Sequence, residues 1–216
     1  MMRSPKHGMR PLRTKKSARK QIKLETARFL VRNARVEDAS EQWGQWMGDA
    51  ETSYMLNAPL KPLTKTEIES YIRMFDQRTH LLLVIVEKAS EKVLGYFRVD
   101  IDDRGGRFLV SMIVGERDYR HKGIMNELTV PFRDYFFETL GLKAMLGTVL
   151  SHNEPVIRYL EKTGLQLDKK VERHVKSRMS DAMFDLCFFS QTAEGWRAWK
   201  RANLATFRLA GPAAVQ

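Results

Sequence analysis

The fold of this chain is decided by the stretch Met112-Ile-Val-Gly-Glu-Arg-Asp-Tyr-Arg-His-Lys-Gly-Ile-Met-Asn-Glu-Leu128. An apolar run leads into a basic turn, and a helical pattern starts directly after it. This order aims backbone N–H groups and the positive end of a helix at one point, which attracts phosphate. Arg120 and Lys122 add full charges there, and Gly123 lets a ligand approach the backbone closely. Taken alone, the stretch also suits an ordinary strand-to-helix connection.

A second segment, Asn153-Glu-Pro-Val-Ile-Arg-Tyr-Leu-Glu-Lys-Thr-Gly-Leu165, follows another apolar run at residues 144–150. Pro155 suits the first turn of a helix, and Gly164 suits the position just past its end. The two segments together resemble the GNAT-type acyl-CoA N-acyltransferases. Arg120 to Gly123 matches the family's Arg/Gln-x-x-Gly pyrophosphate turn, and Asn153 to Leu165 resembles its Asn-x-x-Ser-x-x-Leu-Glu-Lys-x-Gly-Phe helix.

The resemblance covers residues 24–190 and is strongest to the ribosomal-protein and amino-sugar N-acetyltransferase branch. It implies an α+β fold with a mixed, mostly antiparallel central sheet flanked by helices. Two central strands of such a sheet splay apart and admit the pantetheine arm of acyl-CoA. The domain organisation we expect is a basic tail over 1–23, an acetyltransferase domain over 24–190, and a C-terminal helix and tail over 191–216.

Composition fits a soluble protein with one domain of 216 residues. The longest unbroken apolar run, Leu81 to Val86, is too short to cross a bilayer, and no apolar segment follows the basic start as in a secretory signal. Cys187 is the single cysteine, so disulfide frameworks and cysteine metal clusters are excluded, and no metal site is expected. These features predict a cytoplasmic protein.

The formal net charge of +11 comes mostly from the N-terminus. Residues 1–23 hold nine of the 37 basic residues and no acid, which leaves 28 basic against 26 acidic residues in the rest. This segment has too few apolar groups to offset the conformational entropy that ordering would cost. We therefore expect a disordered tail. It is a solvated extension, a segment read from a start codon upstream of the true one, or an attachment to nucleic acid, the ribosome or anionic lipid. An organellar transit peptide is a further alternative, which the lysine-rich composition fits poorly.

Periodicity predicts the order of elements. Helices are expected at residues 36–47, 64–77, 124–140 with a kink at Pro131, 155–163 and 192–204. Strands are expected at residues 29–32, 82–87, 93–102, 108–114, 144–150, 165–175 and 183–190.

The resemblance implies acetyl-CoA as the cofactor and assigns residues to it. The cofactor-binding residues would be Met112, Ile113, Val114, Arg120, His121, Lys122, Gly123, Ile124, Met125 and Asn153. A backbone N–H near Val114 would polarise the thioester carbonyl and stabilise the oxyanion. The acceptor amine would attack directly, without an acyl-enzyme.

An attacking amine must be neutral, and the positions where the family often places a titratable group hold Leu109, Thr148 and Leu160. Tyr159 is one position off, about 100° around the helix, and better suits packing. Met125 and Val156 replace the family's usual small residue and serine. The general base is therefore not fixed by these positions.

Two alternatives remain for the proton. Thr148 could hold a water that passes it to a distant carboxylate such as Asp100, which shares a strand face with Asp102. Alternatively, the acceptor has a low intrinsic pKa and needs little help. His121 belongs beside the phosphates, and His174 suits a structural or substrate-lining place.

The acceptor side is expected between the first two helices, where the chain carries Trp43, Trp46, Tyr54, Met55 and Asn57. The sequence thus predicts an acetyl-CoA-dependent N-acetyltransferase that acts on a primary amine of a protein N-terminus, an amino sugar or another small molecule. The alternative is a non-catalytic acyl-CoA-binding or regulatory domain with a ribosome- or nucleic-acid-associating tail. Whether the helix with Trp196 and Trp199 covers its own core or joins a second subunit in a homodimer stays open.

Overall fold

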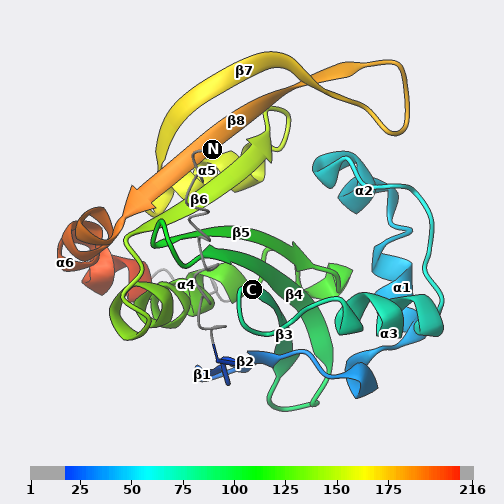
Figure 1. Cartoon of the computed structure of the whole chain (residues 1–216), viewed down its shortest axis with the longest axis horizontal. Helices are drawn as coiled ribbons and strands as arrows, with labels where there is room; N and C mark the ends of the chain where they lie inside the picture. The colour runs from blue at the N-terminus through cyan, green and yellow to red at the C-terminus, as the bar shows by residue number, and fades with distance from the viewer. Residues whose placement is uncertain (1–17, 210–216) are drawn as a thin grey trace, which may run out of the picture.

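The computed structural model describes residues 18–209 and contains a sheet in the order β1-β2-β3-β4-β5-β6-β8-β7 (Figure 1). Neighbouring strands are antiparallel except β5 and β6, which are parallel. The strands are β1 (Lys23–Glu25), β2 (Phe29–Asn33), β3 (His80–Glu87), β4 (Val93–Asp102), β5 (Arg107–Val114), β6 (Ala144–Leu150), β7 (Gln166–Lys176) and β8 (Met183–Thr192). The mixed α+β class with a mostly antiparallel sheet is confirmed.

The helices begin where the sequence supplies a cap. Ser40, Asp49 and Thr64 accept hydrogen bonds from backbone N–H groups in the first turns of α1, α2 and α3, which satisfies donors that a helix start leaves without a partner. The helices are η1 (Val36–Asp38), α1 (Glu41–Trp46), α2 (Ala50–Leu56), α3 (Lys65–Arg73), η2 (Arg117–Tyr119), α4 (Ile124–Asp134), the π-helix η3 (Tyr135–Thr139), α5 (Glu154–Lys162) and α6 (Ala193–Leu209).

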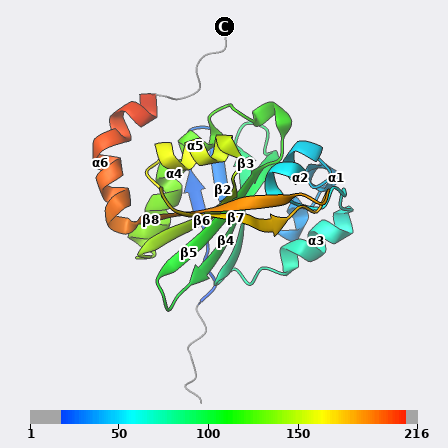
Figure 2. The same ribbon diagram turned by 90° about the horizontal axis from the view of Figure 1, so that it is seen from above.

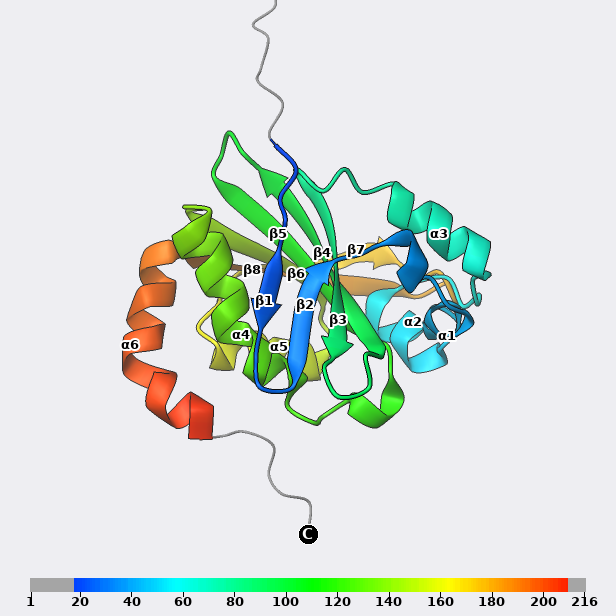
Figure 3. The ribbon, with the colours of Figure 1, turned by 90° about the horizontal axis from the view of Figure 1, so that it is seen from below.

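Each face of the sheet has its own core because side chains alternate along a strand. In β3, Leu81, Leu83 and Ile85 pack toward α4 and α5, while Leu82, Val84 and Val86 pack toward α1 and α3. Figures 2 and 3 show these two groups of helices on opposite sides of the sheet. Side chains on one face of β5 therefore pack toward α4 and α5, and those on the other face pack toward α1 and α3.

The expected helix over residues 36–47 is wrong, since the chain forms η1, breaks, and then forms α1. A further helix, α2, follows in a segment where none was expected. The helix predicted for residues 124–140 ends as an α-helix at Asp134, three residues after Pro131, and continues as a π-helix to Thr139.

The predicted basic tail falls mainly on residues 1–17, which lie outside the described residues. Residues 18–23 belong to the fold, contrary to the boundary expected at residue 24. The Lys20 N–H donates to Gln77 O at 2.7 Å, the Ile22 N–H donates to Asn33 Oδ1 at 2.7 Å, and the Ile22 side chain is 3% exposed. Within residues 18–209, no helix is long and apolar enough to cross a membrane.

Candidate active site

The site begins where β5 and β6 separate. Their parallel pairing covers Arg107 with Ala144, Phe108 with Met145, and Leu109 with Leu146, and stops there. Beyond Leu109, the side of β5 that turns away from β4 has no strand partner among residues 18–209. Unpaired backbone groups of this kind can form hydrogen bonds with an extended ligand, as an added strand would.

Val114 directs its backbone into this gap. The Gly115 N–H donates to Leu94 O on β4 at 2.9 Å, so Gly115 faces β4. Consecutive strand residues point their backbone groups to opposite sides, so Val114 faces away from β4. Arg120 Nε donates to Val114 O at 3.3 Å, which agrees with that direction. The Val114 N–H therefore points away from β4, toward the gap.

The turn between η2 and α4 has the geometry of an anion-binding turn. Both His121 and Gly123 adopt left-handed backbone conformations, with φ of 61° and 74°. Gly123 caps α4 without a side-chain hydrogen bond, so the first-turn N–H groups of α4 have no acceptor from the cap side chain. Successive N–H groups in such a turn form a concavity that suits phosphate oxygens.

Gly115 connects β5 to this turn at a point of close packing. A Cβ at Gly115 would lie 2.0 Å from Cδ2 of Trp46, so only glycine fits beneath the indole ring. The Trp46 indole N–H donates to Glu116 Oε1 at 3.0 Å. Both contacts fix the end of β5 against α1 and hold the turn in place.

Arg120 extends from the turn to the first turn of α2. Its Nη1 lies 2.8 Å from Glu51 Oε2, and its Nη2 donates to Thr52 Oγ1 at 2.9 Å and lies 3.3 Å from Asp49 Oδ1. Arg117 Nε also donates to Asp49 Oδ2, at 2.8 Å. Burial raises the pKa of Asp49, but the hydrogen bonds from Thr52 and Arg117 and the charge of Arg120 outweigh it and hold that pKa well below its usual value.

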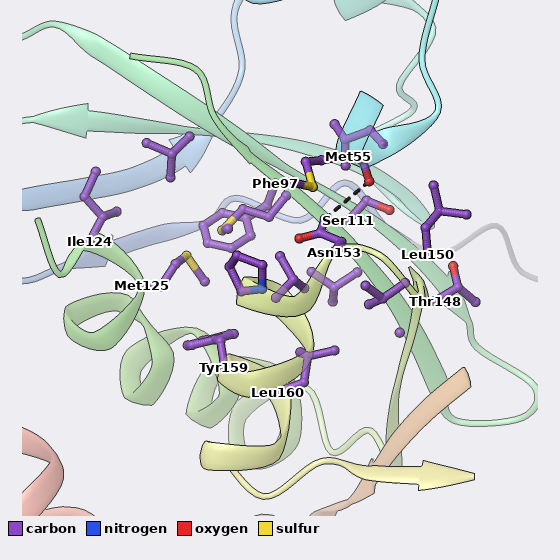
Figure 4. Close-up of a pocket in the computed structure, with 18 of the residues that line it drawn as sticks. Met55, Phe97, Ser111, Ile124, Met125, Thr148, Leu150, Asn153, Tyr159 and Leu160 are labelled. Atoms are coloured by element: carbon purple, nitrogen blue, oxygen red, sulfur yellow. Dashed lines mark hydrogen bonds between the residues drawn. The ribbon is translucent and has the colours of Figure 1, made fainter. Parts of the chain in front are cut away.

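The other end of α2 is held by the start of α5 and by the β7–β8 hairpin. Asn153 Nδ2 donates to Met55 O at 3.3 Å, shown as the dashed line in Figure 4. The ring of His152 stacks on Tyr54 with centroids 4.3 Å apart. Asn57, in a left-handed conformation at the end of α2, donates to Lys176 O at 2.8 Å and accepts from the Arg178 N–H at 2.8 Å. In Figure 1, α2 lies at the open end of the gap between β5 and β6.

These elements enclose a cavity of about 800 Å³, which is within the usual size range of a ligand pocket. Its lining includes residues that the sequence analysis selected: Met112, Val114, Arg120, His121, Gly123, Ile124, Met125, Thr148 and Asn153. Figure 4 shows side chains from β4, β5, β6, α2, α4 and α5 gathered around this space. The structure therefore brings most of the predicted cofactor residues and Thr148 to one place.

Three selected residues do not line the cavity. Asp100 lies on β4 with its Oδ1 2.8 Å from His80 Nδ1 and its Oδ2 2.9 Å from Arg98 Nη2. Ile113 directs its carbonyl toward Gly95 of β4 and its side chain toward the α1 and α3 core, so it offers no backbone group to the gap. Lys122 is exposed, with its Nζ 5.7 Å from the centre of the Tyr119 ring.

Tyr159 lines the cavity as well as packing against its neighbours. Its hydroxyl lies 2.6 Å from Thr129 Oγ1, and that Thr129 hydroxyl donates to Met125 O at 2.5 Å. Since Thr129 has one hydroxyl proton, Tyr159 is the donor to Thr129. The Tyr159 oxygen then keeps lone pairs that can accept a hydrogen bond from a ligand.

The charged side chains that line the cavity are basic. Among the described residues that line the cavity there is no Asp or Glu, while Arg120, Arg133, Lys176 and Arg178 are cationic. Arg133 is buried and holds the end of α5 by donating to Thr163 O at 2.6 Å, and burial lowers its pKa. Lys176 and Arg178 were missed by the sequence analysis. The two strands were predicted, but nothing in their pattern shows that the hairpin tip reaches α2.

Comparison with known proteins agrees with this geometry. The family model of the acetyltransferase (GNAT) domain matches residues 28–166. No curated protein sequence is similar enough to this chain to count as a match.

Solved structures with the same fold include a GCN5-related N-acetyltransferase from Brucella melitensis, with a TM-score of 0.71, 20% identity, and coverage of 89% of this chain and 87% of that one. A ribosomal-protein-S5-alanine acetyltransferase from Vibrio fischeri has a TM-score of 0.66 and 15% identity, over 81% of this chain and 98% of that one. A spermidine N-acetyltransferase from Vibrio cholerae, solved with CoA and spermine, has a TM-score of 0.69 and 13% identity, over 78% of this chain and 98% of that one.

Proposed function

Because the chain belongs to the acetyltransferase (GNAT) family, we propose that it transfers an acetyl group from acetyl-CoA directly to a primary amine. The observation that carries the proposal is the unpaired stretch of β5 beside a cavity into which Val114 turns its backbone. When bound, acetyl-CoA supplies the acetyl group as a thioester.

The residues present fit this cofactor. The left-handed turn at His121 and Gly123 and the first turn of α4 would hold the diphosphate. The free edge of β5 would pair with the pantetheine amides, and the Tyr159 oxygen would accept a hydrogen bond from the same arm. The Val114 N–H would stabilise the oxyanion that develops on the thioester carbonyl.

The chemical step is a displacement at the acyl carbon. The amine nitrogen forms the new C–N bond, the C–S bond breaks, the amine gives up one proton, and the sulfur leaves as the thiol. Thr148 lines the cavity and Asp100 does not, so a relay between them would need to pass outside the lining residues. The acceptor that best suits this site is one with a substantial neutral fraction near pH 7 to 8, such as an α-amine with a pKa of about 7.7–8.0.

The proposal is tested by the release of free thiol from acetyl-CoA across a panel of amines. Val114→Pro removes the backbone donor without removing a bond to β4, and Val114→Ala is its matched control. Loss of an oxyanion donor typically costs about 10²- to 10³-fold in kcat. We expect that loss in the proline variant alone, with acetyl-CoA binding retained.

Binding of acetyl-CoA without thiol release on any amine would overturn the proposal and favour a non-catalytic acyl-CoA-binding domain. Equal rates for Val114→Pro and Val114→Ala, in variants with equal thermal stability, would overturn the role of the Val114 N–H.

A further inference from the structure

The acceptor end of the cavity is marked by two cations on the β7–β8 hairpin, Lys176 and Arg178, which we call the basic rim. Both are exposed and line the cavity next to Asn57 of α2. Their backbone positions are fixed by the two hydrogen bonds to the Asn57 side chain. The rim is therefore a built part of the cavity wall.

The basic rim lies away from the diphosphate turn. Arg120 of that turn contacts the first turn of α2, whereas the rim contacts Asn57 just past its last residue. A helix of seven residues is about 10 Å long, so the two groups of cations stand at opposite ends of α2. The rim is thus separate from the positions that would hold the diphosphate.

The positive charge of the rim is not neutralised by neighbouring carboxylates. Lys176 Nζ lies 3.5 Å from Asp181 Oδ1, and that carboxylate is fully exposed, so the pair is weak. Asp185 is already bound to Lys170 at 2.8 Å and to the Arg173 N–H at 2.9 Å. Within residues 18–209, the Arg178 guanidinium has no ion-pair partner.

Apolar side chains surround the rim. A shallow hollow beside the cavity is lined by Pro59, Leu60, Arg178 and Met179. Leu60 is 51% exposed and Met179 is 44% exposed, although both are large and apolar. A ligand with an anionic group and an apolar part would satisfy both features.

Resting on the proposed acetyl transfer, we propose that the acceptor is a primary amine on a molecule that also carries an anion, a carboxylate or a phosphate, which binds Lys176 and Arg178. The same two cations repel an acceptor that itself carries several positive charges. Polyamines, which carry several positive charges, are the acceptors that this cavity suits least.

The test compares acceptors that differ only in the anion. Ala-Glu-amide, Ala-Gln-amide and Ala-Lys-amide present the same α-amine with different charges, and glucosamine 6-phosphate is compared with glucosamine. Spermidine represents the polyamines. We expect kcat/KM for at least one anionic acceptor to exceed that of its neutral twin by about tenfold, with spermidine lowest. A preference within the peptides would identify the anion as a carboxylate, and a preference within the sugars would identify it as a phosphate.

Arg178→Glu reverses one charge of the rim and keeps the backbone N–H that binds Asn57. We expect it to lower kcat/KM for the anionic acceptor by about tenfold or more, and to leave the KM for acetyl-CoA within about twofold. Arg104→Glu is the matched control, because Arg104 is also exposed but lies in the β4–β5 turn outside the cavity lining.

Two results would overturn the inference. One is equal kcat/KM for anionic and neutral acceptors in both pairs. The other is an increase in the KM for acetyl-CoA, rather than for the acceptor, in Arg178→Glu, which would assign the rim to the cofactor. Calorimetry of the N-acetylated peptides with the CoA-bound protein measures the same preference without turnover. An absence of thiol release from every amine would overturn acetyl transfer. The calorimetric comparison would still show whether the protein prefers the peptide that carries an anion.

Discussion

Arg120 Nη1 lies 2.8 Å from Glu51 Oε2, so an ion pair joins the turn between η2 and α4 to the first turn of α2. Sequence reasoning placed the charge of Arg120 on the phosphates, whereas the structure places its guanidinium on α2. The side chain is 17% exposed, which limits screening by solvent. The end of α2 also lines the cavity, so this contact would link the proposed cofactor and acceptor regions.

We therefore expect Arg120→Gln and Glu51→Gln each to raise the acceptor KM by about three- to tenfold, because each loosens α2. The double variant should be no worse than Arg120→Gln, since the Glu51 contact is already lost in that single variant and the two effects are not additive. Steady-state kinetics for both substrates measure this. Glu154→Gln is the control, because Glu154 pairs with Arg158 at an exposed site outside the lining. A higher KM for acetyl-CoA in Arg120→Gln alone would assign the guanidinium to the phosphates instead.

Gly123→Asp should weaken acetyl-CoA binding far more than Gly123→Asn does. Both side chains face the same left-handed strain at φ 74°, which Asn and Asp tolerate better than other residues. Only Asp adds a negative charge beside the diphosphate, and we expect about a tenfold or larger difference in the dissociation constant from calorimetry. Equal affinities for the two variants would mean that no phosphate lies at this turn.

Asp49→Asn should lower the free energy of unfolding by about 2 kcal/mol at pH 7, because it removes a buried carboxylate with charged hydrogen bonds but keeps a capping side chain. The folded-state pKa of Asp49 is lowered, so its contribution is present above the ordinary Asp value of about 3.9 and is lost as the pH falls below it. Denaturant unfolding at pH 7 and at pH 3 should show the difference between wild type and variant shrinking at the lower pH. A difference that is the same at both pH values would contradict the assignment. Asp181→Asn, at a fully exposed carboxylate, serves as the control and should be near neutral.

Removal of residues 1–23 should destabilise the domain, whereas removal of residues 1–17 should not. The longer deletion takes away the buried Ile22 side chain and the strand residue Lys23, which pairs with Arg32. Loss of a buried aliphatic side chain and its strand pairing is worth about 2–4 kcal/mol. Thermal unfolding of the two truncations measures it, and equal melting temperatures would show that residues 18–23 add nothing to the fold. Salt-sensitive retention on nucleic acid, measured with the shorter truncation, tests the basic segment separately.

The pH dependence of kcat/KM should follow the pKa of the acceptor amine. Within the described lining there is no carboxylate, and Asp100 is bound to His80 and Arg98 outside it. The inflection should move when amines of different pKa are compared, and Asp100→Asn should leave it in place. An inflection that stays fixed for every amine would reveal a base on the protein, with His121 the first residue to replace because it lines the cavity.

Much of the sheet could be read from sequence because its strands alternate or run apolar over several residues. His80–Glu87 and Val93–Asp102 are long enough for periodicity to decide their type. Lys23–Glu25 is too short for any pattern to stand out, and its strand character comes from pairing with β2. The order of β2 to β8 along the chain could therefore be predicted, whereas the edge strand β1 could not.

The missed helix α2 shows the limit in the site. Of its seven residues only Ser53 is buried, so no apolar stripe marks the segment, and its stability comes from contacts at both ends rather than from propensity. Asp49 followed by Thr52 was the available signal, since an Asp at a helix start accepts from a nearby backbone N–H. The ion-pair partner of Arg120 depends on the position of α2. The motif therefore predicted the turn in which the Arg120 backbone lies, but not the contacts of the Arg120 guanidinium.

The short parallel joint between β5 and β6 has a mechanical consequence. β1 to β5 stand on one side of it and β6 to β8 on the other, so few interstrand bonds resist rotation of one half against the other. A ligand bound in the gap would contact both halves of the sheet and restrict their relative rotation. Amide hydrogens at the ends of β5 and β6 should then exchange with solvent much more slowly when the cofactor is bound, so the ligand would be a structural member of the sheet as well as a reactant.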